Sequence, residues 1–169
     1  MSPAKPPSPP FPSDNHDHDH CIAEALDRAE AICTGRGARL TALRRRVLEL
    51  IWASHAPVGA YEVLRRLSQE HARAAPPTVY RALDFLLEQG LIHRIESLNA
   101  FVGCDDPTDR HTGQFLICDD CGSAAELQDS RINKAISAGA TKAGFAVARS
   151  TVEVRGLCPG CRETRSDHD

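Results

Sequence analysis

Two Cys-x-x-Cys pairs, Cys118/Cys121 and Cys158/Cys161, constrain this chain more than any other feature of its sequence. Each pair follows a β-prone run, and a glycine within or beside each pair permits a tight turn of the backbone. Two such turns brought together offer four thiolates in a closed tetrahedral shell, which is the usual arrangement of structural zinc. We therefore expect the four cysteines to form one structural zinc site.

Disulfides and redox couples are the other common uses of such cysteines. The N-terminal sequence MSPAKPPSPPFPSDNHDHDH lacks the apolar segment of a secretory signal, so we expect the chain to stay in the reducing cytoplasm, where structural disulfides are rare. A thioredoxin-type redox pair opens a helix directly after a strand, and we expect neither pair to be placed that way. A thiol-redox switch stays open as an alternative.

Charge is divided along the chain, although the net charge is only −3. Residues 36–95 carry ten arginines against five acidic residues, whereas the segments before and after are each net acidic. The same segment shows apolar residues at helical spacing, followed by two short β-prone runs around 97–100, a pattern typical of a winged helix-turn-helix. This combination indicates DNA as the partner, with the last helix in the major groove. A helical core with no DNA role is the alternative.

After Cys104 the pattern changes to two strand-like runs, a helix and a further strand. The predicted fold class is therefore α+β, with an N-terminal winged helix-turn-helix domain followed by a small C-terminal α/β domain that holds the four cysteines. No apolar run reaches the roughly 18 residues that a membrane-spanning helix needs, so no membrane partner is expected. The expected boundaries are a disordered tail at 1–20, the winged-helix domain at 21–103, a linker at 104–112, the α/β domain at 113–163 and a tail at 164–169.

Four further candidate ligands fall around the predicted junction of the two domains: His93, Cys104, His111 and Glu126. A mixed set of nitrogen, sulfur and oxygen donors can bind zinc, and a thiolate favours zinc over harder metals. Spacing alone leaves open an ordinary histidine and a buried, inert cysteine. A zinc deaminase would need an H-x-E motif, which this sequence lacks.

The stretch PPTVYRALDFLLEQGLIHRIES, together with FLICDDCG and LCPGC, closely resembles the ferric uptake regulator family of metal-dependent repressors. The resemblance covers about residues 22–163 and keeps the order of the family's motifs. Within the family, the chain resembles the zinc sensors, because the iron sensors typically carry an HHDH-like cluster where this chain has RHTGQF. The zinc sensors' regulatory site, built from His, Cys, His and Glu, matches His93, Cys104, His111 and Glu126.

The resemblance implies a zinc-responsive repressor of zinc uptake genes rather than an enzyme, with one structural and one regulatory zinc ion per subunit. It also implies a cytoplasmic homodimer, held by the C-terminal domain, that binds a palindromic operator in double-stranded DNA. An iron- or peroxide-sensing regulator of the same family is the alternative. The residues expected to contact DNA are Arg44, Arg45, Tyr61, Thr78, Tyr80 and Arg81.

Three details of the resemblance concern other candidate ligands. Asp109 competes with His111 as the fourth regulatory ligand, because the spacing of this segment varies in the family. His55, near an additional ligand of some iron-type members, is expected to be a surface histidine. The HDHDH sequence at 16–20 is expected to be solvated and to bind metals only weakly, because ordering a flexible segment around an ion costs entropy.

Overall fold

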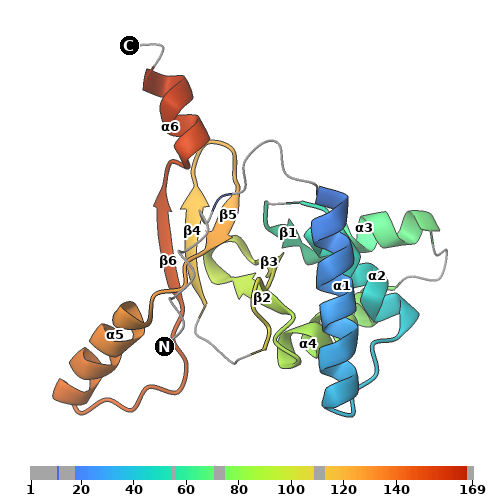
Figure 1. The fold of residues 1–169 in the computed structure, drawn as a ribbon, viewed down its shortest axis with the longest axis horizontal. Coiled ribbons are helices and arrows are strands. Elements are labelled where there is room, and N and C mark those ends of the chain that lie inside the picture. Colours follow the sequence, from blue (N-terminus) through green and yellow to red (C-terminus); the bar gives the residue numbers. More distant parts are fainter. Residues whose placement is uncertain (1–10, 12–17, 55, 71–74, 109–112, 167–169) are drawn as a thin grey trace, which may run out of the picture.

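The computed structural model describes residue 11 and residues 18–54, 56–70, 75–108 and 113–166. Two units lie side by side, a mainly helical N-terminal unit and a C-terminal unit built on a second sheet (Figure 1). The N-terminal unit contains α1 (His18–Gly35), α2 (Ala42–Trp52), β1 (Val58–Gly59), α3 (Ala60–Glu70), α4 (Pro76–Glu88), β2 (Ile92–Ile95), a 3-10 turn (Glu96–Leu98) and β3 (Ala100–Gly103). The C-terminal unit contains β4 (Gln114–Cys118), β5 (Ala124–Glu126), α5 (Ser130–Lys142), β6 (Val152–Gly156) and α6 (Pro159–Ser166). The predicted α+β fold class is confirmed.

Local sequence signals set the ends of the helices that lead into the wing. The Thr41 side chain caps α2 by accepting a hydrogen bond from the backbone N–H of Arg44. Gly90 follows α4 with a φ of 66°, and the N–H of Leu91 donates to the Leu86 carbonyl at 2.9 Å. This is a Schellman ending, which glycine favours because the left-handed conformation strains other residues. It turns the chain directly from α4 into β2.

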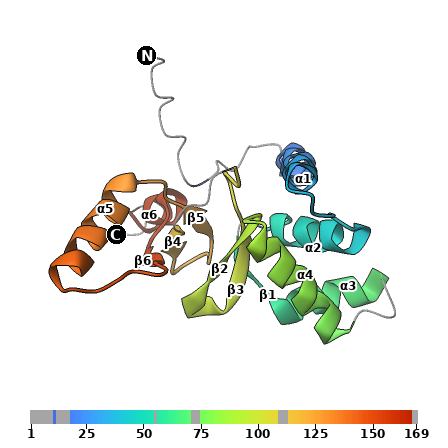
Figure 2. The same cartoon turned by 90° about the horizontal axis from the view of Figure 1, so that it is seen from below.

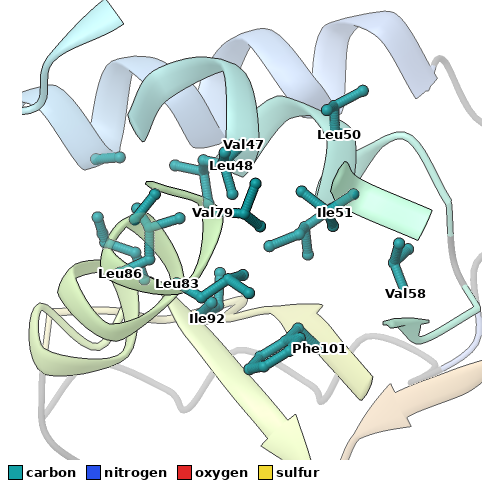
Figure 3. Packing of buried hydrophobic residues seen from close by; sticks show 14 of the residues in the cluster. Val47, Leu48, Leu50, Ile51, Val58, Val79, Leu83, Leu86, Ile92 and Phe101 are labelled. Carbon is teal, nitrogen blue, oxygen red and sulfur yellow. The ribbon is translucent and has the colours of Figure 1, made fainter. Parts of the chain in front are cut away.

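An apolar core joins α2 and α4 to the small sheet of the N-terminal unit. Figure 3 shows the α2 and α4 side chains pointing toward one another, with Ile92 of β2 and Phe101 of β3 beneath them. This core fixes the position of α4 relative to the wing. Its buried members on the two helices are Val47, Leu48, Leu50 and Ile51 of α2 and Val79, Ala82, Leu83 and Leu86 of α4.

The wing is a three-stranded sheet in the order β1–β3–β2, with β3 antiparallel to both neighbours. The predicted hairpin is present, and its turn contains Asn99 in a left-handed conformation with a φ of 47°. β1 is an addition that the sequence did not reveal, since two residues are too few for an alternating pattern. Trp52 packs over Gly103, where a β-carbon would lie 2.3 Å from its ring.

The C-terminal sheet has the order β5–β4–β6, with β5 antiparallel and β6 parallel to β4. The predicted β-β-α-β order is present, although β6 begins only at Val152 in a longer β-prone run. α6 was not predicted, and it extends three residues into the expected tail at 164–169. At the other end of the chain, α1 begins at His18 and therefore includes the last three residues of the expected tail at 1–20.

The wing also contacts the C-terminal sheet. In both Figure 1 and Figure 2, β2 and β3 lie between the helices of the N-terminal unit and the strands β4 and β5. Ile95 of β2 packs with Phe115 and Ile117 of β4 in a small buried cluster. This contact places the end of β2 beside the C-terminal sheet, where the second set of candidate ligands lies.

Candidate metal centres and DNA-facing surface

The two Cys-x-x-Cys pairs meet at one end of the C-terminal sheet, as predicted. One candidate ligand atom from each of Cys118, Cys121, Cys158 and Cys161 lies within 4.8 Å of all the others. The Sγ atoms of Cys121 and Cys158 are 3.8 Å apart. Tetrahedral zinc with Zn–S bonds of about 2.3 Å requires sulfur–sulfur separations of about 3.8 Å. The cluster therefore fits zinc without rearrangement of the chain.

Backbone amides already favour thiolates at this centre. The N–H of Cys158 points at the Cys118 sulfur, with a nitrogen–sulfur distance of 3.4 Å. This hydrogen bond, with a second from Cys121, lowers the pKa of Cys118 to about 6. Hydrogen bonding to Cys158 instead raises the pKa of Cys161 to about 12. Four thiols this close cannot all ionise without a cation among them, and a bound zinc ion would stabilise all four as thiolates.

The expectation that neither Cys-x-x-Cys pair opens a helix after a strand is wrong for the second pair. Cys158 directly precedes α6, and Cys161 lies in the first turn of that helix, after β6. The second pair therefore opens a helix after a strand, because Pro159 and the following residues continue into a helix that the sequence pattern did not reveal. All seven cysteines lie in the described part of the chain, and none forms a disulfide there. The meeting of four thiols, rather than the placement of either pair, is what favours metal.

A second cluster brings together three of the four predicted regulatory ligands. Candidate ligand atoms of His93 on β2, Cys104 after β3 and Glu126 on β5 lie within 4.8 Å of one another. His93 Nε2 is 3.1 Å from Glu126 Oε1, and both side chains are largely shielded from solvent. The N-terminal unit supplies the imidazole and the thiol, and the C-terminal unit supplies the carboxylate. This cluster therefore bridges the two units.

The electrostatics of the second cluster also suit a cation. Burial raises the pKa of the Cys104 thiol well above its usual range, and the Glu126 carboxylate raises it further. The backbone N–H of Asp105 donates to Glu126 Oε2 at 3.4 Å, which fixes the carboxylate. The ring of Phe115 meets the imidazole of His93 edge-on, with centroids 5.3 Å apart. A divalent cation would neutralise the carboxylate and stabilise the thiolate, so nitrogen, sulfur and oxygen donors here fit zinc.

Several other predicted ligands lie outside the described residues. These are His111, its competitor Asp109, His55 and the first two residues of the HDHDH sequence. His18 and His20 belong to α1, and the imidazole of His20 lies 3.4 Å from Glu24 on the exposed side of that helix. His20 belongs to no cluster of metal-binding groups among the described residues.

Four of the predicted DNA contacts lie at or near the N-terminal ends of α3 and α4. Tyr61 is 79% exposed and Tyr80 is 55% exposed. The two rings help to line a shallow hollow of about 200 Å³ between these helix ends. Thr78 is half-buried, and Arg81 is exposed and forms no ion pair with the described residues. This surface offers aromatic rings and a cation that no acidic side chain of the described residues neutralises.

The two remaining predicted contacts, Arg44 and Arg45, are engaged within the protein. The Arg44 guanidinium lies 3.6 Å from the centre of the Phe85 ring and donates to the Arg39 carbonyl at 2.7 Å. Arg45 pairs with Glu30 of α1 at 3.0 Å. Other arginines of this unit also form ion pairs within the protein, among them Arg46 with Glu70 and Arg65 with Glu62. The structure therefore offers no support for assigning these two arginines to DNA phosphates.

The predicted family resemblance is confirmed by comparison with known proteins. The profile of the ferric uptake regulator family matches residues 35–155. The chain belongs to this family. It is a regulator rather than an enzyme, as the resemblance implied. Among the described residues, no helix combines the length and apolar character needed to cross a membrane.

Two proteins illustrate the range of similarity within the family. The zinc uptake regulation protein of Escherichia coli (strain K12) is 42% identical over 146 residues, which is 85% of this chain and 84% of that protein. The peroxide-responsive repressor PerR of Staphylococcus aureus (strain USA300) is 23% identical over 142 residues, which is 84% of this chain and 95% of that protein. The sequence therefore lies much nearer to the zinc regulator than to this peroxide sensor.

Two solved structures of zinc regulators are also similar to this chain. A zinc uptake regulator complexed with zinc and DNA aligns with a TM-score of 0.82 at 40% identity, covering 86% of this chain and 97% of that one. The crystal structure of holo XcZur aligns with a TM-score of 0.76 at 45% identity, covering 83% of this chain and 98% of that one. Each of these two likenesses covers more than four fifths of this chain.

Proposed function

We propose that this chain is a zinc-responsive, sequence-specific DNA-binding repressor of zinc uptake genes. The observation that carries the proposal is the cluster of His93, Cys104 and Glu126, which joins the wing to the C-terminal sheet. Similarity to a zinc uptake regulation protein and to a regulator complexed with zinc and DNA supports the same conclusion. Because such a regulator acts where the DNA is, we place it in the cytoplasm.

We assign two zinc ions to each subunit. Cys118, Cys121, Cys158 and Cys161 hold a structural ion in a closed shell with no position left for water or substrate. His93, Cys104 and Glu126 hold the regulatory ion, with His111 as the fourth ligand and Asp109 as its competitor. When bound, the regulatory ion supplies a cross-link between the two units, which we take as domains at 21–103 and 113–163 joined by a linker at 104–112.

α4 is the element proposed to enter the major groove. Arg81 projects from its exposed side and can make a bidentate contact to guanine. Thr78 in the first turn can bind a phosphate or a base edge, and Tyr61 and Tyr80 frame the hollow beside it. The core beneath α4 holds these groups in one orientation relative to the wing.

We propose a homodimer, which is supported by surfaces that one subunit leaves exposed. Phe145 is 68% exposed and Val154 is 49% exposed, although both are large apolar residues. No residue of α5 is buried, and β6 forms one edge of the C-terminal sheet. A second copy covering this face would relate two winged helices by a two-fold axis, which suits a palindromic operator.

Zinc control then depends on how the two units are aligned. Without the cross-link, the winged helices of a dimer would sample many separations, and only a fraction would match successive major grooves. Ligands from both units favour one arrangement when zinc is bound, so zinc raises operator affinity by raising the population of that arrangement. Linkage makes the effect reciprocal, and operator DNA should tighten regulatory zinc binding, typically by about 1–3 kcal/mol.

The test compares two histidine variants of the full-length chain. His93→Ala should leave a folded dimer that keeps its four-cysteine zinc but no longer responds to zinc in operator binding. His20→Ala, on the exposed side of α1, is the matched control and should respond as the parent does. Operator DNA selected by the parent protein is titrated at buffered free zinc. A His93→Ala variant with the parent's zinc response would place the sensing site elsewhere.

A thiol-redox switch is a second candidate, because the pair Cys158/Cys161 opens a helix after a strand. Such a switch predicts that oxidation releases zinc and converts thiols of this pair into a disulfide. Counting free thiols with and without zinc, before and after mild oxidation, distinguishes it from a purely structural site. Full protection of all four thiols by zinc would exclude it.

A further inference from the structure

Three side chains of the C-terminal sheet form one row across its strands. The register pairs Phe115 of β4 with Glu126 of β5 on one side and with Glu153 of β6 on the other. Residues paired across neighbouring strands project from the same face of a sheet. The row therefore presents a carboxylate, an aromatic ring and a second carboxylate to whatever lies against that face, and the wing lies there (Figure 2).

Two members of the row contact the same wing residue. Glu126 approaches the imidazole of His93, with 3.1 Å between the carboxylate oxygen and Nε2. Phe115 packs edge-on against the same imidazole and shares a buried cluster with Ile95 at the end of β2. This half of the row is the C-terminal side of the regulatory zinc site already described.

The third member of the row, Glu153, contacts the wing a few residues further along. Its carboxylate accepts a hydrogen bond from the backbone N–H of Glu96 at 2.7 Å and another from that of Ser97 at 3.3 Å. These N–H groups open the 3-10 turn of the hairpin, where the turn itself provides no acceptor for them. Burial raises the pKa of Glu153, but hydrogen bonds from Ser97 and Glu96 outweigh it and hold the pKa below its ordinary value. The carboxylate is therefore ionised at neutral pH, when its hydrogen bonds are strongest.

We propose that Glu153 is a positioning residue that holds the wing on the C-terminal sheet without metal and so sets His93 opposite Glu126 for the regulatory zinc. β2 ends at Ile95, one residue before the first amide that Glu153 binds. Because Glu153 fixes the backbone at Glu96, His93, three residues earlier in the chain, has little freedom to move away from the sheet. The inference rests on the proposed function, because it assigns zinc to the site that Glu153 organises.

The expected consequence is a change in zinc sensitivity rather than in DNA recognition. If Glu153 raises the fraction of apo protein whose ligands are already assembled, its removal weakens the apparent affinity for regulatory zinc by that fraction. Hydrogen bonds to a charged group of this kind correspond to a shift of about tenfold or somewhat more. Once zinc saturates the site, the cross-link itself aligns the units, and operator affinity should equal that of the parent.

The experiment uses three variants of the full-length protein with the four-cysteine site loaded. Glu153→Ala removes both hydrogen bonds, Glu153→Gln keeps an acceptor oxygen without the charge, and Glu163→Ala removes an exposed carboxylate of α6 as the matched control. Operator binding is titrated against buffered free zinc. We expect the midpoint to rise about tenfold for Glu153→Ala, by less for Glu153→Gln, and not at all for Glu163→Ala. Operator affinity at saturating zinc should be the same in all four proteins.

The contrary results distinguish failure of the proposed function from failure of the role assigned to Glu153. A parent protein that binds operator DNA equally at all zinc levels would overturn the proposed function and this inference with it. A zinc-responsive parent with an unshifted Glu153→Ala midpoint would overturn this inference alone. A loss of operator affinity that persists at saturating zinc in both Glu153 variants would also overturn it, since that would be a general structural defect.

Discussion

The two units of this regulator differ in how much buried apolar core each contains. The N-terminal unit buries an apolar cluster drawn from all four of its helices and from its small sheet. Among its described residues, the C-terminal unit contributes only Phe115 and Ile117 to a buried cluster, and none of its α5 residues is buried. The first unit therefore has an apolar core of its own, whereas the second has little buried apolar surface, and we propose that the four-cysteine site and a second copy of the chain stabilise it.

Loss of the four-cysteine site should give the largest effect. Cys118→Ser should remove about one zinc ion per subunit and unfold the C-terminal unit, because metal-binding energy at a structural site is folding energy. The dimer should be lost with it, while the N-terminal helices stay folded on their own core. Zinc analysis, sedimentation and circular dichroism together check this. A folded, zinc-replete dimer would contradict the assignment.

A core substitution in the N-terminal unit should reduce packing there and leave the metal site intact. Leu83 on α4 is almost completely buried in the larger core. Leu83→Ala should lower the free energy of unfolding of that unit by about 2–5 kcal/mol, because it leaves a cavity. Zinc content per subunit should not change. Chemical denaturation followed by helical signal measures the effect, and Phe145→Ala, at an exposed site, serves as the control that should weaken only the dimer.

A smaller effect is expected from the surface proposed to contact DNA. Arg81→Ala should cost roughly 1–3 kcal/mol of operator binding and relax base preference, if this guanidinium reads a base edge. Arg45→Ala should cost less, because Arg45 already pairs with Glu30. Binding to operator and to random DNA is compared for both variants. Equal losses on the two DNAs for Arg81→Ala would reassign it to the phosphate backbone.

Both the fold class and the four-cysteine site could be predicted from local patterns. The helices of the first unit carry apolar residues at helical spacing. Thr41 and Gly90 are residue types that favour helix ends, so they can be recognised in the sequence. The four cysteines could be identified as a metal site because each pair has the short Cys-x-x-Cys spacing. Only one contact between the two turns is then needed to bring all four ligands together. In these cases, the signal lies within a few residues of the structure that it specifies.

Other features depend on contacts between distant segments and could not be predicted from the sequence. Spacing alone could not show that His93 meets Glu126, because their contact depends on how the wing lies on the second sheet. The row that includes Glu153 follows from strand register, which no local pattern reveals. The ion pair between Arg45 and Glu30 likewise depends on how α1 packs against α2, which no local pattern reveals.

We propose that a zinc ion between the units controls DNA binding, while the zinc ion within the C-terminal unit does not. Measuring zinc bound per subunit and operator affinity together, across a range of buffered free zinc, tests it most directly. The first zinc ion should stay bound at the lowest free zinc without operator binding, and operator affinity should rise in step with the second. Full operator affinity with one zinc ion per subunit, unchanged as the second binds, would contradict the claim.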